Sequence, residues 1–300
     1  MLIVDELNKL NSIIISSLSD NSSLISDELI NFITAKSKKL RPSVLFLFAK
    51  ALNIPISEKI YSLACAVELI HNSTLIHDDI IDNAQTRRGK VSLNIKLGNN
   101  LSVLAGDTLL AVALKQLAAC NNIDVINTFA DCLYNMCKGE INQDFNLNNL
   151  PDLEEYIKKS EYKTAELFKA PLISLAYLYN IPQKSEITEF ARNFGITFQI
   201  KDDLLNILNT DTSKPSLNDI YNGVYTAPVL FLNEDVKIEN LTKEKITELV
   251  QNKKYIQKTI DLIKKYAEKT IEVINFMPDN IYKKEIINIT ENLYKAGING

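Results

Sequence analysis

Two clusters of acidic residues are the part of this sequence best suited to chemistry. The first is His77-Asp78-Asp79-Ile80-Ile81-Asp82, the second is Asp202-Asp203-Leu204-Leu205-Asn206, and each follows an apolar stretch. Residues four apart lie one above the other on a helix, so Asp78 and Asp82 are spaced to share one cation. Mg²⁺ prefers oxygen ligands and commonly bridges one or two carboxylates to substrate phosphates. Two such clusters in one chain favour magnesium binding over a solvated patch of surface charge.

Basic residues occur in separate groups near the acidic ones. Arg87-Arg88-Gly89 begins five residues beyond Asp82, and Lys38-Lys39-Leu40-Arg41-Pro42 precedes an apolar stretch. Guanidinium groups bind phosphate oxygens through pairs of parallel hydrogen bonds. Carboxylates for a metal and cations for phosphate are the two requirements of a site for diphosphate esters.

Long helices are expected to position these residues. Apolar residues recur at helical spacing through most of the chain, and no segment shows the alternation of a half-buried strand, so the predicted fold class is all-α. The pattern predicts helices over about 58–82 and 185–208. Asp152 and Glu155 have the spacing of a capping box, and Pro171 is expected to kink or divide the helix that they begin.

The composition excludes several classes of protein. Hydrophobic residues make up 46% of the 300 residues and charged residues 23%, which is typical of a globular protein. Only 8 Gly and 8 Pro occur, and this favours long helices over turn-rich β folds. The formal net charge of -4 provides no global basic field, so nucleic acid is not an expected partner. Without an internal repeat or a linker-like change in composition, residues 1–300 are predicted to form a single domain.

The sequence favours a cytoplasmic location. We expect no membrane span, because the apolar stretch from Val44 to Phe48 is followed by Lys50 and Asn53. The N-terminus lacks the basic and small-residue segments of a secretory signal. The four cysteines lack paired spacing, which indicates neither a disulfide framework nor a zinc site.

The order and spacing of these motifs resemble the trans-isoprenyl (polyprenyl) diphosphate synthases over most of the chain. Besides both acidic and both basic groups, the similarity includes Glu68 to His71, Gly106-Asp107, Gly139-Glu140 with Gln143, Lys163-Thr164, Phe198-Gln199, Lys214, and Asp219, Gly223, Thr226 and Pro228. The resemblance implies the isoprenoid synthase type of helical bundle around a deep central cavity. It also implies a homodimer.

By this resemblance, the chain condenses an allylic diphosphate, such as farnesyl or geranyl diphosphate, with isopentenyl diphosphate. The allylic substrate loses its diphosphate, the double bond of isopentenyl diphosphate attacks the resulting carbocation, and a proton departs. Carboxylate-held Mg²⁺ and cationic side chains stabilise the departing diphosphate.

The resemblance also assigns residues to roles. The metal ligands would be Asp78, Asp82, Asp202 and Asp203. The cationic partners of the allylic diphosphate would be Arg87, Lys163 and Lys214. The isopentenyl diphosphate site would contain Lys38, Arg41, His71 and Arg88, while Thr164 and Gln199 would orient the reacting end. The expected catalytic residues are therefore Asp78, Asp82, Arg87, Lys163 and Asp202.

Product length is expected to depend on the residues one helical turn before the first acidic cluster. Thr74 lies four residues before Asp78, Ser73 lies beside it, and both side chains are small. Family members that make the shorter farnesyl product usually have an aromatic residue there. We therefore expect an all-trans product of geranylgeranyl length or longer, released with at most a transient membrane contact. The alternative is that Ser73 and Thr74 only pack against another helix.

Two positions depart from the family pattern and keep alternatives open. Asn206 stands where many members have aspartate, and Val224 stands where shorter-chain members have lysine. Both departures are compatible with a non-catalytic partner subunit of a heteromeric prenyl synthase. A class I terpene cyclase shares the ionisation chemistry but fits less well, because a cyclase has no need of a second cationic site.

Overall fold

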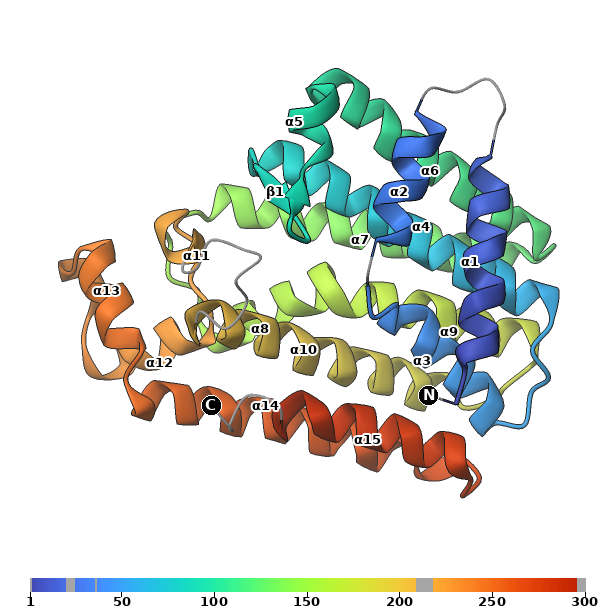
Figure 1. Cartoon of the computed structure of the whole chain (residues 1–300). Helices are drawn as coiled ribbons and strands as arrows, with labels where there is room; N and C mark the ends of the chain where they lie inside the picture. Colours follow the sequence, from blue (N-terminus) through green and yellow to red (C-terminus); the bar gives the residue numbers. More distant parts are fainter. Residues whose placement is uncertain (1, 20–24, 36, 209–217, 296–300) are drawn as a thin grey trace. The chain divides into compact units, whose positions relative to one another are not determined.

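The computed structural model describes residues 2–19, 25–35, 37–208 and 218–295. These residues are almost entirely helical, and one short hairpin supplies the strands in the described part of the chain (Figure 1). The all-α prediction is therefore confirmed.

Contacts within the chain divide it into two compact units. The first combines Met1–Phe129, Pro171–Pro182 and Pro278–Lys283, and the second combines Ala130–Ala170, Gln183–Met277 and Lys284–Gly300. The chain passes from one unit to the other within three helices, α7 (Ile123–Phe145), α9 (Glu166–Leu178) and α15 (Ile281–Lys295). The single-domain organisation expected from the sequence stays a prediction.

Two long helices, α4 (Glu58–Ile81) and α6 (Asn99–Ala119), pack along each other in the first unit. Gly106 permits their close approach, because a β-carbon at this position would overlap the imidazole ring of His77. The unit also contains α1 (Val4–Leu18), α2 (Ser26–Thr34), α3 (Leu40–Ala51) and α5 (Leu93–Leu97). The end of α4 that carries the first acidic cluster is thus held against α6.

A small hairpin follows α4 and presents the arginine pair. Strand β1 (Thr86–Arg87) runs antiparallel to β2 (Lys90–Val91), with Arg87 opposite Lys90. Both turn residues have left-handed backbones, Arg88 with φ 53° and Gly89 with φ 74°. Positive φ at both central residues is typical of a two-residue type I′ turn, for which glycine is favoured. Arg87, in strand β1, and Arg88, in the turn, therefore have different backbone conformations although they are adjacent in sequence.

The second unit is built on α10 (Lys184–Leu208) and α14 (Lys253–Val273), which lie side by side in Figure 1. Ile196, Ile200 and Leu204 of α10 share a buried apolar cluster with Ile263 of α14. Further helical segments of this unit are α8 (Leu153–Ser160), a π-helical segment (Glu161–Ala165), α11 (Asn218–Tyr221), α12 (Ala227–Asp235), α13 (Lys243–Val250) and the 3-10 turns Ile238–Asn240 and Ile274–Phe276. The apolar face of α10 is therefore buried, and its last turns carry the second acidic cluster.

The predicted helix boundaries hold at most places. Helices α4 and α10 each begin and end within one residue of the predicted limits. The capping box of α8 is confirmed, since Asp152 accepts from the Glu155 amide at 2.8 Å and the Glu155 side chain accepts from the Asp152 amide at 2.9 Å. Pro171, in contrast, lies inside α9 and does not divide it. The interruption lies earlier, in the π-helical segment, which proline content cannot predict.

Helix α6 corrects the expectation that no segment is long and apolar enough to span a membrane. By length and composition alone, Asn99–Ala119 meets that criterion, with a mean hydropathy of 1.4 and 33% of the window buried. A core helix of a water-soluble protein meets the same criterion, so this is weak evidence of a span. Single polar residues such as Asp107 interrupt the apolar runs of this helix. Its high mean hydropathy was therefore not evident from the sequence.

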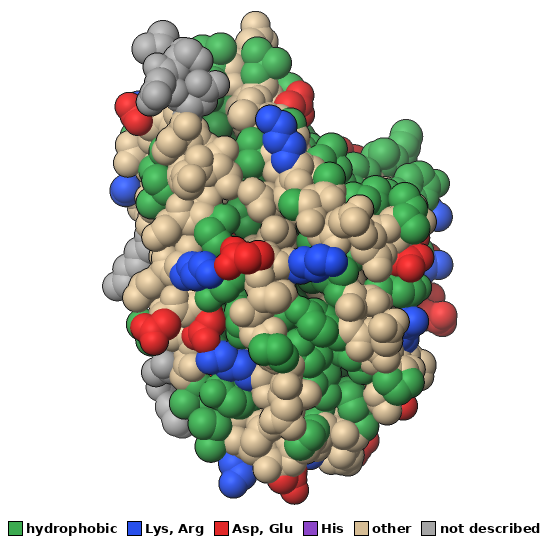
Figure 2. Space-filling model, turned by 90° about the vertical axis from the view of Figure 1, so that its right-hand side faces the viewer, with side chains coloured by type: hydrophobic (Ala, Val, Ile, Leu, Met, Phe, Trp, Pro, Cys, Tyr) green, Lys and Arg blue, Asp and Glu red, His purple; other side chains and the backbone are tan. Residues whose placement is uncertain are grey.

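Charged side chains are dispersed on the face that Figure 2 shows. Lys and Arg side chains lie singly and beside Asp or Glu side chains, with apolar and uncharged groups between them. The described residues on this face therefore form no continuous basic field of the kind that binds a nucleic acid backbone.

Candidate active site

The first acidic cluster lies at the C-terminal end of α4, in the first unit. Asp78 is partly buried, and Asp82 is exposed at the C-cap, where its amide donates to the Asp78 carbonyl at 2.8 Å. The two residues are one helical turn apart, as their spacing predicts. Carboxylates at this end of a helix oppose its dipole. A bound cation would therefore stabilise the helix end as well as attract a phosphorylated substrate.

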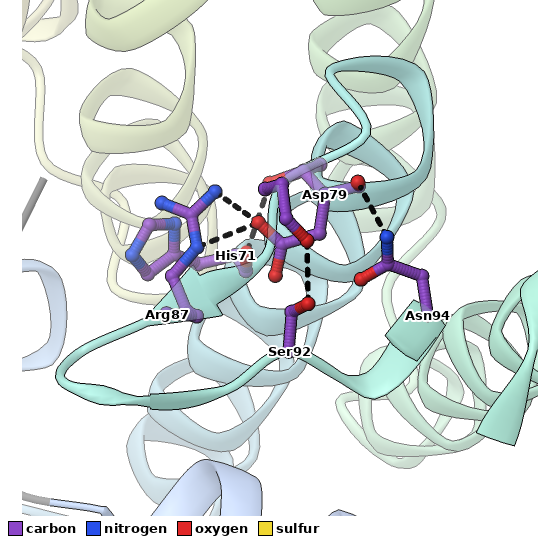
Figure 3. Close-up of polar contacts among 7 residues, drawn as sticks. His71, Asp79, Arg87, Ser92 and Asn94 are labelled. Carbon is purple, nitrogen blue, oxygen red and sulfur yellow. Dashed lines mark hydrogen bonds and ion pairs between the residues drawn. The ribbon is translucent and has the colours of Figure 1, made fainter. Parts of the chain in front are cut away.

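Asp79 lies between these two and has a different role. It is 1% exposed, and its Oδ1 accepts hydrogen bonds from Arg87 Nη2 and, at 2.8 Å, from Arg87 Nε (Figure 3). Its backbone carbonyl accepts from Asn94 Nδ2 at 3.1 Å. Asp79 therefore holds Arg87 in place, a role that the sequence analysis did not assign. One feature of the sequence could have indicated this role. Asp79 lies about 100° around the helix from Asp78 and is therefore on a different face.

His71 lies on the same helix, two turns before Asp78, and points toward Arg87 in Figure 3. Burial lowers the pKa of His71 well below its ordinary value, and the charges of Arg41, Arg88 and Arg87 lower it further. The imidazole is therefore neutral at neutral pH. Three guanidinium groups acting on one imidazole mark a positive region suited to a polyphosphate anion.

The predicted residues at the start of α3 join this region. Lys38 is exposed, and Arg41 is partly buried in the first turn of the helix. Lys39, with φ 42°, occupies the N-cap, and its Nζ lies 3.7 Å from Oε1 of Glu68, which is 2% exposed. Burial lowers the pKa of Lys39, while the Glu68 carboxylate raises it. The structure therefore brings Arg41, His71, Arg87 and Arg88 together, and adds the pair Lys39 and Glu68.

The second acidic cluster lies in the last turns of α10, in the second unit. Asp202 is exposed, whereas Asp203 is 6% exposed. The Tyr156 hydroxyl donates to Asp203 Oδ2 at 2.6 Å, and Gln199 Nε2 donates to Oδ1 at 2.7 Å. Burial is the main cause that raises the pKa of Asp203 to about 6, and the charge of Asp219 adds to it. Asp202 is the accessible carboxylate of the pair, and Asp203 is oriented by its two neighbours.

Lys163 and Thr164 lie in the π-helical segment of the same unit. The Thr164 hydroxyl donates to Gln199 Oε1, and Gln199 in turn donates to Asp203, so three predicted site residues form one hydrogen-bonded chain. Lys163 Nζ donates to Glu140 Oε2 at 3.1 Å. Glu140 was not among the residues predicted for the site. Its place in the Gly139-Glu140 motif was the signal that could have included it.

The remaining predicted residues are Lys214 and the two residues expected to control product length. Lys214 lies outside the described residues. Ser73 is fully buried, and its hydroxyl donates to the Gly106 carbonyl of α6 at 2.9 Å. Thr74 is only partly buried and donates to the His71 carbonyl at 2.9 Å. Ser73 therefore packs against another helix, and Thr74 is the better candidate for contact with a growing chain.

The donor sets suit Mg²⁺ better than a transition metal. No group of three or more His, Cys, Asp or Glu side chains that could hold a metal occurs in the described part of the chain. The candidate ligands are instead pairs of carboxylates, Asp78 with Asp82 and Asp202 with Asp203. Zinc sites generally use three or four nitrogen or sulfur ligands. Mg²⁺ retains waters and takes further ligands from substrate phosphates, so two carboxylates are sufficient.

Comparison with known proteins agrees with this geometry. The family model described as polyprenyl synthetase matches residues 23–266. Among similar curated proteins, solanesyl-diphosphate synthase 1 of Oryza sativa subsp. japonica is 32% identical over 86% of this chain and 69% of its own length. A prenyl transferase of Cyanidium caldarium is 31% identical over 91% of this chain and 90% of its own length.

Solved structures are similar over nearly the whole chain. Heptaprenyl diphosphate synthase from Staphylococcus aureus has a TM-score of 0.91 and 25% identity, and the similarity covers 97% of each chain. Polyprenyl synthase from Caulobacter crescentus CB15, solved with calcium and isoprenyl diphosphate, has a TM-score of 0.89 and 25% identity over 98% of this chain and 95% of its own. The helical fold, the family match and these relatives agree, and the chain belongs to the polyprenyl synthetase family of prenyltransferases.

Proposed function

We propose that this chain is an all-trans polyprenyl diphosphate synthase with a product of geranylgeranyl length or longer. Its substrates are an allylic diphosphate, farnesyl or geranyl diphosphate, and isopentenyl diphosphate. The observation that carries the proposal is the grouping of Arg41, Arg87 and Arg88 around a neutral His71, within the unit that also holds Asp78 and Asp82. An anion site and a divalent cation site in one unit are what a diphosphate substrate requires.

The reaction breaks the C–O bond between the allylic carbon and its diphosphate. The double bond of isopentenyl diphosphate then forms a new C–C bond with the allylic cation, and the proton lost from the adduct passes to the released diphosphate. Charge separation is the main barrier, so preorganised positive charge beside the leaving group contributes most. Asp78 with Asp82, and Asp202 with Asp203, would hold Mg²⁺, and the bound metal would supply part of that charge.

The cationic side chains divide between the two substrates. By the family resemblance, Arg87, Lys163 and Lys214 would bind the allylic diphosphate, and Lys38, Arg41, His71 and Arg88 would bind isopentenyl diphosphate. Asp79 and Glu140 fix the positions of Arg87 and Lys163, which reduces the entropy lost when substrate binds. Thr164 and Gln199 orient the reacting end through their mutual hydrogen bond.

A cytoplasmic homodimer is part of the same proposal. Exposed apolar residues on α6 support the homodimer, since Leu101, Leu104 and Leu114 are 46%, 58% and 52% exposed. Several exposed apolar side chains on one helix are typical of a surface that a second protein chain covers. Product release then involves at most a transient contact with a membrane.

One assay tests the proposal. The purified chain is incubated with Mg²⁺, farnesyl diphosphate and labelled isopentenyl diphosphate, and the dephosphorylated products are separated by length. We expect labelled all-trans products of at least geranylgeranyl length. Products without incorporated label would indicate a terpene cyclase. Turnover that appears only after a second, different subunit is added would indicate a non-catalytic partner subunit.

A further inference from the structure

The second unit contains a cavity that the sequence did not predict. Its volume is about 580 Å³, and the end of α7, helix α8 and residues 223–225 form its walls. Six lining side chains carry amide or ammonium nitrogens, beside Glu155 and several apolar residues: Asn142, Gln143, Asn146, Asn149, Lys158 and Lys159. Amide and ammonium groups donate hydrogen bonds, and phosphate oxygens accept them. The cavity is therefore chemically suited to a phosphorylated anion.

Lys159 is the lining residue most closely linked to the second acidic cluster. Its Nζ lies 5.9 Å from the ring centroid of Tyr156, whose hydroxyl donates to Asp203. The carboxylates of Asp203, Asp219 and Glu140 act on its charge. Within the described residues its ammonium forms neither a hydrogen bond nor an ion pair. The residue is only partly buried, so its three ammonium donors remain accessible to solvent and to a ligand.

Position 224 lies in the wall of the same cavity. Val224 brings no charge there, at a position where the family resemblance implies lysine in shorter-chain members. Lys159, on α8, therefore brings a positive charge into a cavity where Val224 supplies none.

We propose that Lys159 is a further substrate-binding residue, which contacts the diphosphate held through Mg²⁺ at Asp202 and Asp203 and takes over the role of a cation at position 224. The inference rests on the proposed function and adds a residue to the same site. Burial lowers the pKa of Lys159 and the neighbouring carboxylates oppose that shift. A bound diphosphate would favour the charged form further.

Lys159→Met tests the contact, because it keeps the length of the side chain and removes the charge. The probe is inorganic pyrophosphate with MgCl₂, titrated calorimetrically into the full-length protein. We expect the pyrophosphate Kd to rise about tenfold, which corresponds to ~1.4 kcal/mol. The KM for the allylic diphosphate should rise similarly, with the KM for isopentenyl diphosphate changed less than about twofold. Lys265→Met removes the same charge from an exposed site on α14 and should leave all three constants unchanged.

Rescue by a cation at position 224 distinguishes binding from a structural role. We expect Lys159→Met combined with Val224→Lys to restore pyrophosphate binding to within about threefold of the wild type. Val224→Lys alone should tighten binding. The thermal unfolding curve of Lys159→Met shows whether that variant folds. If it does not fold, Val224→Lys alone still tests the inference.

Two outcomes separate the inference from the proposed function. If Lys159→Met and Val224→Lys both bind pyrophosphate as the wild type does, while Lys163→Met binds it more weakly, the role of Lys159 is overturned and the proposed function stands. If the wild type binds no pyrophosphate in MgCl₂ and makes no prenyl product, both are overturned.

Discussion

At the scale of residues, acidic side chains hold the predicted substrate-binding cations in place. Asp79 bonds Arg87 in the first unit, and Glu140 bonds Lys163 in the second. A long flexible cation that is already oriented loses less conformational entropy when it binds a phosphate. The carboxylates beside the site therefore divide into candidate metal ligands and residues that position cations.

Asp79→Asn tests the positioning role of a buried carboxylate. The substitution keeps the shape of the side chain but leaves Arg87 without its ionic partner, and loss of one partner of a buried ion pair costs about 3 kcal/mol. We expect the free energy of unfolding, measured in urea, to fall by roughly that amount. The KM for the allylic diphosphate should rise. Asp79→Asn combined with Arg87→Met should recover part of the stability. Unchanged stability in the single variant would contradict the role of the pair.

His71 is expected to make stability depend on pH. Its pKa is lowered in the folded protein by burial and by three arginines. The unfolded chain, with His71 at an ordinary pKa near 6.5, binds the proton more readily. Stability is therefore fully present above that value and is lost as the pH falls through it. We expect His71→Gln to lose less unfolding free energy than the wild type between pH 7.5 and pH 5.5 in urea titrations. Parallel profiles for the two proteins would refute this.

At the scale of elements, α4 carries chemistry on one side and packing on the other. Asp78, His71 and Thr74 lie on partly exposed positions, whereas Ser73 and His77 contact α6 at Gly106. The fit of α4 against α6 therefore fixes the direction in which the first acidic cluster points. A change at the contact should affect both stability and activity.

Gly106→Ala tests this helix contact. The added methyl group would overlap the His77 ring, and overpacking of this kind typically costs about 1–3 kcal/mol. We expect a lower melting temperature, because the His77 ring must move, and a reduced kcat if its movement displaces the end of α4. Gly106→Ala combined with His77→Ala removes the overlap and should restore most of the stability. If the double variant is no more stable than Gly106→Ala, the clash is not the cause.

Thr74→Phe tests the control of product length. An aromatic ring one turn before Asp78 should block elongation, so we expect a product at least one isoprene unit shorter with substantial activity retained. Ser73→Phe is the matched comparison. Because the Ser73 hydroxyl is buried against the Gly106 carbonyl, that variant should lose stability instead. Identical product lengths for the wild type and Thr74→Phe would exclude this residue as a determinant of length.

At the scale of the whole molecule, α6 presents an apolar surface that the described chain does not cover. Its exposed leucines are compatible with a second copy of the chain, and the proposed homodimer would bury them. Burial of such residues on association is driven by the removal of apolar area from water.

Leu101→Glu combined with Leu104→Glu tests the dimer. Charges at two buried interface positions cost desolvation without a partner, so we expect the molar mass measured by light scattering to fall from that of a dimer to that of a monomer. Val236→Glu, at another exposed apolar position, should leave the mass unchanged. A wild-type protein that is already monomeric at micromolar concentration would rule out this role for α6.

The sequence by itself determined the fold class and the two acidic clusters, because helical periodicity and i, i+4 spacing are local properties that a chain carries in its order of residues. The order of its motifs carried the resemblance to the family. It did not reveal that Asp79 bonds Arg87, that Ser73 faces α6, or that Lys159 and Val224 line one cavity. Those relations join residues on different elements of the fold. Only packing decides which face of a helix is buried, and therefore which of several similar carboxylates or lysines remains available to a ligand.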